Sequence, residues 1–248
     1  MKTKLTGAFV IGFDGDDHVI YQDGEVVYEE DRIEYVGHDY AQPVDRTIDA
    51  GLAMISPGFI DLDALADIDH AILDTWVSPD IGLGLHWSAD YFRHRRRDVF
   101  TREEEAFKHR FALSQLALNG ITTFMPIAGE YAKAWCETVE EFADVVDITG
   151  DLGLRAYLGC SYRSGINVVH EDGRRDVLWD EAQGERGLCD AVRFVEEFDG
   201  VQQGRIKGCL LPARIETVTL DLLHRTKQAA DDLGCHIRLH CLQGADEL

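Results

Sequence analysis

From residue 55 onward, short apolar segments alternate with longer amphipathic ones, and this alternation constrains the fold more than any other feature of the chain. The apolar segments have the length of strands, whereas the segments between them show the spacing of apolar residues that is typical of helices. Because a helical crossover returns the chain to the same end of a sheet, this order predicts parallel strands in an α/β fold. The five predicted strands are MISPGFIDLDA, ITTFMPIA, LRAYLGCSY, GRIKGCLLPA and HIRLHCL.

Four helices are predicted between these strands. The first begins after Thr101, whose side chain can accept a hydrogen bond from the first turn, and ends at Gly120. Acidic residues follow Thr101 directly, where the helix dipole favours negative charge. The other three helices are predicted over residues 131–153, near 180–198 and over 219–234.

The N-terminal region has a different pattern, with short segments rich in β-branched and aromatic residues. The segment QDGE, residues 22–25, is predicted to be a hairpin turn because Asp-Gly favours tight turns between strands. The expected domains are a β module over residues 1–54 and a strand–helix region over residues 55–248.

The charge of the chain excludes some classes of partner. Its formal net charge is -22, from 46 acidic and 24 basic residues. Such a surface repels phosphate backbones, so we expect no nucleic-acid partner. The sequence has neither an apolar run long enough to span a membrane nor the pattern of a signal peptide. We therefore expect a cytoplasmic protein without a membrane partner.

The order of the motifs resembles the N-terminal part of the amidohydrolase superfamily, in the branch of cytosine deaminases, guanine deaminases and triazine hydrolases. GEVVYEEDRIEYVGH followed by RTIDAGLAMISPGFIDLDA resembles the β module and first barrel strand of that family. GITTFMP, LGLRAYLGCSYRSG, GRIKGCLLPA and LGCHIRLHCLQGADE resemble the next four strand segments. The resemblance covers essentially the whole chain and is most specific at residues 57–61. It implies a (β/α)8 TIM barrel, of which about five strands are present, preceded by a small β-sandwich-like module.

The resemblance also implies a metal site, in which two histidines of the first strand bind one divalent ion. Here those two positions are Asp63 and Leu65. Leucine has no donor atom, whereas a carboxylate binds zinc, iron or manganese. Asp63 is therefore either a metal ligand or an acceptor for a neighbouring loop. The implied cofactor is one divalent metal ion (Zn, Fe or Mn) in an altered mononuclear site.

The fifth predicted strand carries the other candidate ligand, His240, which matches the metal-binding histidine of the family. The alternative is a histidine whose hydrogen bonds are satisfied in the core. His236 and Arg238 are expected to face the helices or to lie at the entrance of the strand.

Three further residues are candidates for contact with the substrate. Gln243 stands where the family has a glutamate that acts as general acid and base. Glutamine cannot transfer that proton and can only orient substrate or water. His70 either contacts the substrate, substitutes as a ligand or is an ordinary loop residue. Trp87 either stacks on a planar substrate or covers the core.

The implied function is that of a hydrolase acting on carbon–nitrogen bonds other than peptide bonds, or on a ring carbon–halogen bond, in a small-molecule substrate such as a ring or an amide. The remaining strands and ligands of the family's barrel are not in this sequence. A barrel left open predicts a longer protein, a second-half chain or a homo-oligomer. The alternative functions are a metal-free, non-catalytic paralogue and a subunit that needs a partner chain.

Overall fold

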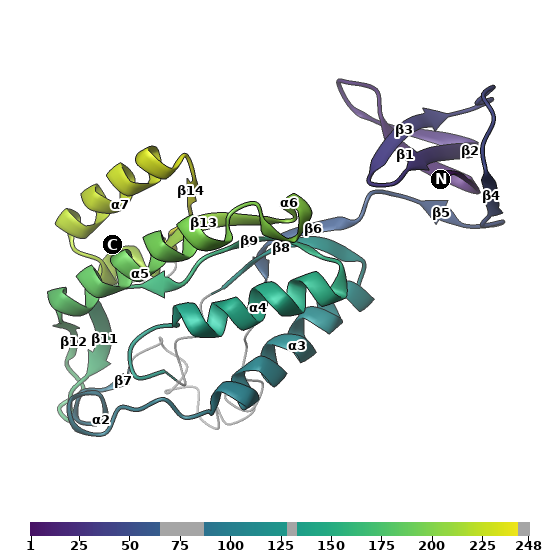
Figure 1. The fold of residues 1–248 in the computed structure, drawn as a ribbon. Coiled ribbons are helices and arrows are strands. Elements are labelled where there is room, and N and C mark those ends of the chain that lie inside the picture. Colours follow the sequence, from purple (N-terminus) through teal and green to yellow (C-terminus); the bar gives the residue numbers. More distant parts are fainter. Residues whose placement is uncertain (65–86, 128–132, 243–248) are drawn as a thin grey trace. The chain divides into compact units, whose positions relative to one another are not determined.

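The computed structural model describes residues 1–64, 87–127 and 133–242. The chain divides into two compact units, Met1–Gly58 and Phe59–Leu248 (Figure 1).

The first unit is a single mixed sheet. Its strand order is β3-β2-β1-β4, and β5 also pairs with β1. The pairs β1–β2 and β2–β3 are antiparallel, whereas β4 and β5 run parallel to β1. The described residues form one sheet and not two packed sheets, so a sandwich-like module is not shown. The strands are β1 (Lys2–Phe13), β2 (His18–Glu29), β3 (Arg32–Gly37), β4 (Arg46–Asp49) and β5 (Met54–Ile55).

The predicted hairpin turn at residues 22–25 is wrong, because these residues lie inside β2. The ladder with β1 continues on both sides of Asp23, which takes a left-handed φ of 51°. A side chain at Gly24 would place its Cβ 2.7 Å from Cβ of Tyr21. The Asp-Gly pair therefore serves a local irregularity and close packing within a long strand.

The second unit is built on a curled, six-stranded parallel sheet, as the alternation of strands and helices predicts. Its order is β10-β13-β9-β8-β6, with β14 also paired to β13, and every pair is parallel. The predicted strand at residues 54–64 is two separate strands, of which β5 belongs to the first unit. The strands are β6 (Phe59–Ala64), β8 (Ile121–Pro126), β9 (Arg155–Leu158), β10 (Ser161–Tyr162), β13 (Ile206–Pro212) and β14 (His236–Ile237).

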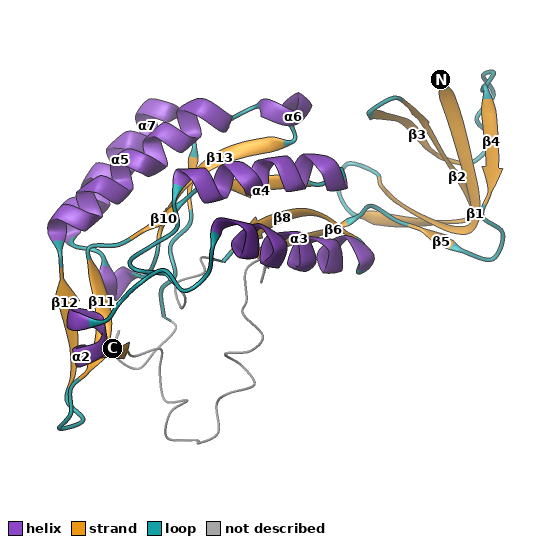
Figure 2. Ribbon diagram, turned by 60° about the horizontal axis from the view of Figure 1, so that its bottom comes forward, coloured by secondary structure: helices purple, strands orange, loops and turns teal. Residues whose placement is uncertain are grey.

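Four helices cover one face of this sheet (Figure 2): α3 (Arg102–Leu118), α4 (Val139–Leu152), α5 (Glu181–Phe198) and α7 (Leu220–Leu233). The predicted start of α3 is confirmed, since the Thr101 side chain accepts from the backbone N–H of Glu104 and the Glu104 carboxylate accepts from that of Thr101. This capping box satisfies two backbone donors. Helix α4 starts at Val139, eight residues later than predicted, where Thr138 caps it.

The core of this unit lies between the helices and the sheet. Phe124 of β8, Phe142 of α4 and Phe194 of α5 belong to one buried cluster, and each is at most 2% exposed. Burying one such side chain stabilises the fold by about 1.5–3 kcal/mol. A second cluster packs α5 and α7 against Leu210 of β13.

Several elements were not predicted from the sequence. A three-stranded sheet of β7 (Trp87–Ser88), β11 (Gly165–Val169) and β12 (Arg175–Trp179) follows the order β12-β11-β7. The short helices are α2 (Ala89–His94), α6 (Val201–Gly204) and the 3-10 helix η1 (Ile215–Thr217). Within the described ranges, no helix has both the length and the apolar character needed to cross a membrane.

Candidate functional site

The carboxyl ends of the parallel strands lie at one edge of the sheet, which we call the rim. The face of the sheet that lies away from the helices is called the inner face. On β13, a Cβ at Gly208 would meet Val195 of α5 at 2.8 Å, and Leu210 belongs to the helix-side core. Since side chains alternate along a strand, Cys209 points to the opposite, inner face. Cys209 is fully buried and pairs with His236 of β14.

His236 and Arg238 therefore lie on the inner face, so the expectation that they face the helices is wrong. His236 is the first residue of β14, which agrees with the alternative of a position at the strand entrance. The ring of His236 lies 5.8 Å from that of Tyr157 on β9, measured between centroids. The backbone N–H of Arg238 donates to the carbonyl of Leu210 at 3.0 Å, which continues the parallel ladder beyond β14. Alternation then places Arg238 on the same face as His236.

The Arg238 guanidinium is a half-buried cation at this rim. Its Nε and Nη1 atoms are buried, and no hydrogen-bond partner for either lies in the part of the chain that the structure describes. Burial lowers the pKa of Arg238, and the nearby Glu137, Cys209 and Asp63 oppose that shift. The two carboxylates thus supply negative charge near the guanidinium without pairing with these two nitrogens.

Glu137 lies between β8 and α4 and is itself held in place. It is buried, and its carboxylate accepts a 2.7 Å hydrogen bond from the backbone N–H of Ser161 at the start of β10. This contact links the segment between β8 and α4 to β10.

Asp63 lies near the carboxyl end of β6, and its side chain is exposed. Its backbone N–H donates to the Asp61 carboxylate at 3.0 Å. The pairing of β6 with β8 shifts register between Asp61 and Ala64, so simple alternation does not assign the face of Asp63. Its carboxylate is the last of the charges that oppose the effect of burial on the pKa of Arg238.

His240 lies at the carboxyl end of the β13–β14 pair, where it forms an isolated parallel bridge with Arg214. Its backbone N–H donates to Ala213 at 3.3 Å, and its carbonyl accepts from Ile215 at 2.9 Å. The side chain is half-buried. Asp63 and His240 thus both belong to strand ends at the rim, and their roles as ligands stay predictions.

Several predicted positions fall outside the described residues. Leu65, His70 and Gln243 lie in the segments that the structure does not describe. For Trp87 only the backbone is described, and it pairs with Val168 of β11.

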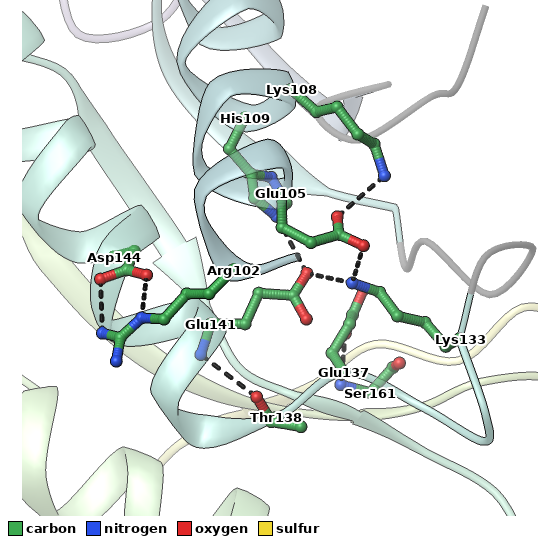
Figure 3. Close-up of polar contacts among 10 residues, drawn as sticks. All are labelled: Arg102, Glu105, Lys108, His109, Lys133, Glu137, Thr138, Glu141, Asp144 and Ser161. Carbon is green, nitrogen blue, oxygen red and sulfur yellow. Dashed lines mark hydrogen bonds and ion pairs between the residues drawn. The ribbon is translucent and has the colours of Figure 1, made fainter. Parts of the chain in front are cut away.

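A charged network that was not predicted lies between the first turns of α3 and α4, and we call it the Lys133 network: Glu105, Lys108, His109, Lys133 and Glu141 (Figure 3). The Lys133 ammonium lies 2.8 Å from a carboxylate oxygen of Glu105 and 2.6 Å from one of Glu141. His109 contacts Glu141 at 3.0 Å, and Lys108 contacts Glu105 at 2.8 Å. All but Lys108 are less than 8% exposed. One signal in the sequence was available, since Glu105 and His109 are four residues apart and share one helix face.

The electrostatics of this network favour the charged forms of Lys133 and Glu141. Burial lowers the pKa of Lys133, but Glu141 and Glu105 outweigh it and raise that pKa above its usual value. Burial raises the pKa of Glu141, and His109 with Lys133 overcomes this effect and lowers it. Each buried charge therefore has an opposite charge in contact.

The chemistry of the donors allows a test of where a metal ion fits. One oxygen or nitrogen from each of Glu105, His109 and Glu141 lies within 4.8 Å of the others, and these atom types suit zinc. The Lys133 ammonium, however, already bonds to both carboxylates. At the rim, Asp63 and His240 are also donors of the right type, but the described residues there supply no group of three close donors.

Comparisons with known proteins show which proteins this chain is similar to. No protein-family model matches it. It is 25% identical to a 5-methylthioadenosine/S-adenosylhomocysteine deaminase of Desulfitobacterium hafniense, over 100% of this chain and 51% of that protein. It is 26% identical to a 5'-deoxyadenosine deaminase of Methanosarcina mazei, over 98% of this chain and 50% of that protein. The chain thus spans about half the length of the curated relatives it matches.

Solved structures show the same fold. Guanine deaminase from C. acetobutylicum matches with a TM-score of 0.69 at 15% identity, over 100% of this chain and 55% of that one. Atrazine chlorohydrolase TrzN from Arthrobacter aurescens, complexed with zinc, matches with a TM-score of 0.62 at 18% identity, over 96% and 52%. Together with the relatives, these matches confirm that the chain resembles the amidohydrolase superfamily, in its branch of deaminases and triazine hydrolases.

Proposed function

We propose that this chain is part of a hydrolase that cleaves a carbon–nitrogen bond of a small, ring-containing substrate. The observation that carries the proposal is similarity to two kinds of deaminase, the 5-methylthioadenosine/S-adenosylhomocysteine deaminase and the 5'-deoxyadenosine deaminase. This similarity extends over essentially the whole chain. Both names describe removal of an amino group from an adenine nucleoside derivative, which makes this the first substrate class to test. Hydrolysis of a ring carbon–halogen bond is the second, because the fold is also that of a chlorohydrolase.

We further propose that residues 55–248 are the N-terminal part of a (β/α)8 barrel and that residues 1–54 are part of a composite β domain. The remaining strands would come from a longer form of this chain, a second-half chain or a homo-oligomer. The state of the edge strand β6 supports this proposal, since Ile60 and Leu62 are 66% and 57% exposed. An edge strand with exposed apolar side chains favours pairing with another strand.

For the site, we propose that Asp63 and His240 hold one divalent metal ion, Zn, Fe or Mn, together with donors from outside the described residues. Such a metal, when bound, would activate a water molecule for attack on the substrate at neutral pH. Gln243 would orient the substrate or a water through its amide, and His70 and Trp87 would contact the substrate. Glu137 holds the adjoining segment at the rim through Ser161.

The test is a substrate panel with matched variants. The purified protein, supplied with zinc, is incubated with 5'-methylthioadenosine, 5'-deoxyadenosine, guanine and atrazine, and ammonia and chloride release are measured. Asp63→Ala and His240→Ala are compared with Asp151→Ala, an exposed residue of α4 that pairs with Arg110.

We expect ammonia from at least one adenine nucleoside, retained in Asp151→Ala. Both rim variants should lose roughly 100-fold or more in rate, because each removes a ligand on which the nucleophile depends. A folded protein that releases neither product from any of the four compounds would contradict the proposal and favour a non-catalytic paralogue.

A further inference from the structure

We propose that the outward face of α3 is a dimerisation surface, on which a second copy of this chain packs its own α3 in the antiparallel direction. The surface is a stripe of four positions along the helix, Phe107, Phe111, Ser114 and Leu118. It is separate from the edge strand β6, and it does not depend on the proposed function.

The stripe is a second apolar face on a helix that already has a buried one. Leu113 of α3 lies in the core, and His109 is 2% exposed. At about 100° per residue, the three apolar residues of the stripe lie about 160–180° around the helix from His109. Phe107, Phe111 and Leu118 are 70%, 47% and 79% exposed. A helix that packs on a sheet with one face is normally polar on the other, so the stripe indicates a further contact.

Neither the neighbouring helices nor completion of the barrel accounts for the stripe. Among the described residues of α4 and α5, no large apolar side chain is exposed. In a (β/α)8 barrel the helices lie beside one another around the sheet. A helix that continued the barrel would therefore cover the flank of α3 opposite to α4 and would leave its outward face open.

The spacing of the stripe identifies a second copy as the partner. Its positions are separated by four, three and four residues, so the pattern is the same in both directions along the helix. A two-fold interface pairs such positions reciprocally. With the axis at the middle of the stripe, Phe107 meets Leu118 of the second copy, and Phe111 meets Ser114. The small Ser114 leaves room for the phenyl ring, and its hydroxyl already donates to a carbonyl of its own helix at 2.7 Å.

The charges of α3 select the antiparallel direction. Its first turn contains Glu103 and Glu104, whereas its last turn contains no basic residue. Parallel packing would place the two acidic first turns against each other, and like charges in contact oppose association. Antiparallel packing instead places each acidic turn beside the uncharged segment Gln115–Leu118 of the other copy.

The size of the surface predicts a weak dimer. A phenyl side chain presents about 150–250 Å², so the three apolar side chains would bury roughly 600–800 Å² in a dimer. Stable interfaces bury at least about 1,000 Å². A groove of about 620 Å³ between α3 and α4, with Phe107 and Ile148 in its lining, offers additional contact. We therefore expect a dissociation constant in the range of about 1–100 μM.

The experiment measures the dissociation constant of the dimer by sedimentation velocity as a function of protein concentration. It is done in about 1 M NaCl, because the net charge of -22 makes two copies repel and the Debye length is then only about 3 Å. All proteins carry Leu62→Lys, so that pairing through β6 does not contribute. The variants are Phe107→Glu, Leu118→Lys and the two combined. Leu220→Glu is the matched control, because Leu220 is 70% exposed on α7.

Each single substitution at the stripe should weaken the dimer about 10-fold or more, because it places an unpaired charge in an apolar contact. The combined variant should associate about 5-fold or more tightly than either single variant, because its opposite charges meet across the two-fold axis. The two positions are eleven residues apart in one helix, about 16 Å, so this recovery cannot arise within one copy. Leu220→Glu should stay within about twofold of its parent.

Three results would overturn the proposal. A protein that stays monomeric at every concentration would assign the stripe to another occupant. A dimer that is unchanged in both single variants would be held by another surface. A combined variant no tighter than the single ones would contradict the antiparallel pairing.

Thermal unfolding checks that the stripe is free within one copy. Since all the substituted side chains are exposed, each variant should keep its midpoint within about 2 °C of the parent under conditions where both are monomeric. A large drop in Phe107→Glu and Leu118→Lys, absent from Leu220→Glu, would show that the same chain covers the stripe and would also overturn the proposal.

Discussion

The ammonium of Lys133 lies 2.6 Å from a carboxylate oxygen of Glu141, and both side chains are buried. Lys133 precedes α4, and Glu141 lies in the first turn of that helix. The same ammonium also contacts Glu105 of α3. One lysine thus joins the starts of two helices at the end of the sheet where the candidate site lies (Figure 3).

Lys133→Met should strongly destabilise the protein, because it leaves two buried carboxylates without their shared cation. Loss of one partner from a buried pair costs about 3–5 kcal/mol in the free energy of unfolding. Urea unfolding of the variant and of the unmodified protein measures this difference in the free energy of unfolding. The control is Lys227→Met, which removes an exposed partner of Asp231 and should cost less than about 0.5 kcal/mol. Equal effects of the two substitutions would mean that the Lys133 network contributes no more than a surface pair.

The lowered pKa of Glu141 predicts a pH dependence of stability. A carboxyl group whose pKa is lower in the folded state stabilises the protein above its unfolded pKa, and this contribution is lost as the pH falls through the folded value. His109 and Lys133 outweigh the opposing effect of burial on Glu141. Unfolding free energy measured from about pH 7 to about pH 3 should therefore decline less steeply in Glu141→Gln than in the unmodified protein. Parallel declines would show that Glu141 does not titrate below its usual range.

The exposed edge strand β6 predicts self-association. Leu62→Lys places a charge on an edge strand with exposed apolar side chains, which opposes strand pairing. Sedimentation velocity should show less association in this variant. Leu52→Lys is the matched control, because Leu52 is 95% exposed but lies outside the strands of its unit. If both variants associate as the unmodified protein does, β6 is not the surface involved.

The sequence predicted the parallel sheet because its signals are local and repeated. Each apolar segment is bounded by helix caps, such as Thr101 before α3 and Gly234 after α7. The Asp-Gly pair in β2 misled the prediction for a physical reason. The Asp-Gly pair favours a tight turn on its own. The long ladder between β1 and β2 outweighs this local preference, so the pair stays inside an irregular strand.

The site was less predictable than the fold. Asp63 and His240 were found through motif positions in strands. The Lys133 network depends on a contact between α3, α4 and the residues before α4, and no local pattern encodes such a contact. The helix-facing alternative for Arg238 was wrong because the sequence does not show which residues pair with β13, whereas the pair Cys209–His236 in the structure does.

Elemental analysis of the protein, purified without chelator or affinity metal, tests the central claim of a metal-dependent hydrolytic site at the rim. It compares the unmodified chain with Asp63→Ala, His240→Ala and Glu105→Gln, the last of which alters the Lys133 network. The account predicts near-stoichiometric zinc, iron or manganese that is lost in both rim variants and kept in Glu105→Gln. Metal-free protein, or metal lost only in Glu105→Gln, would contradict it.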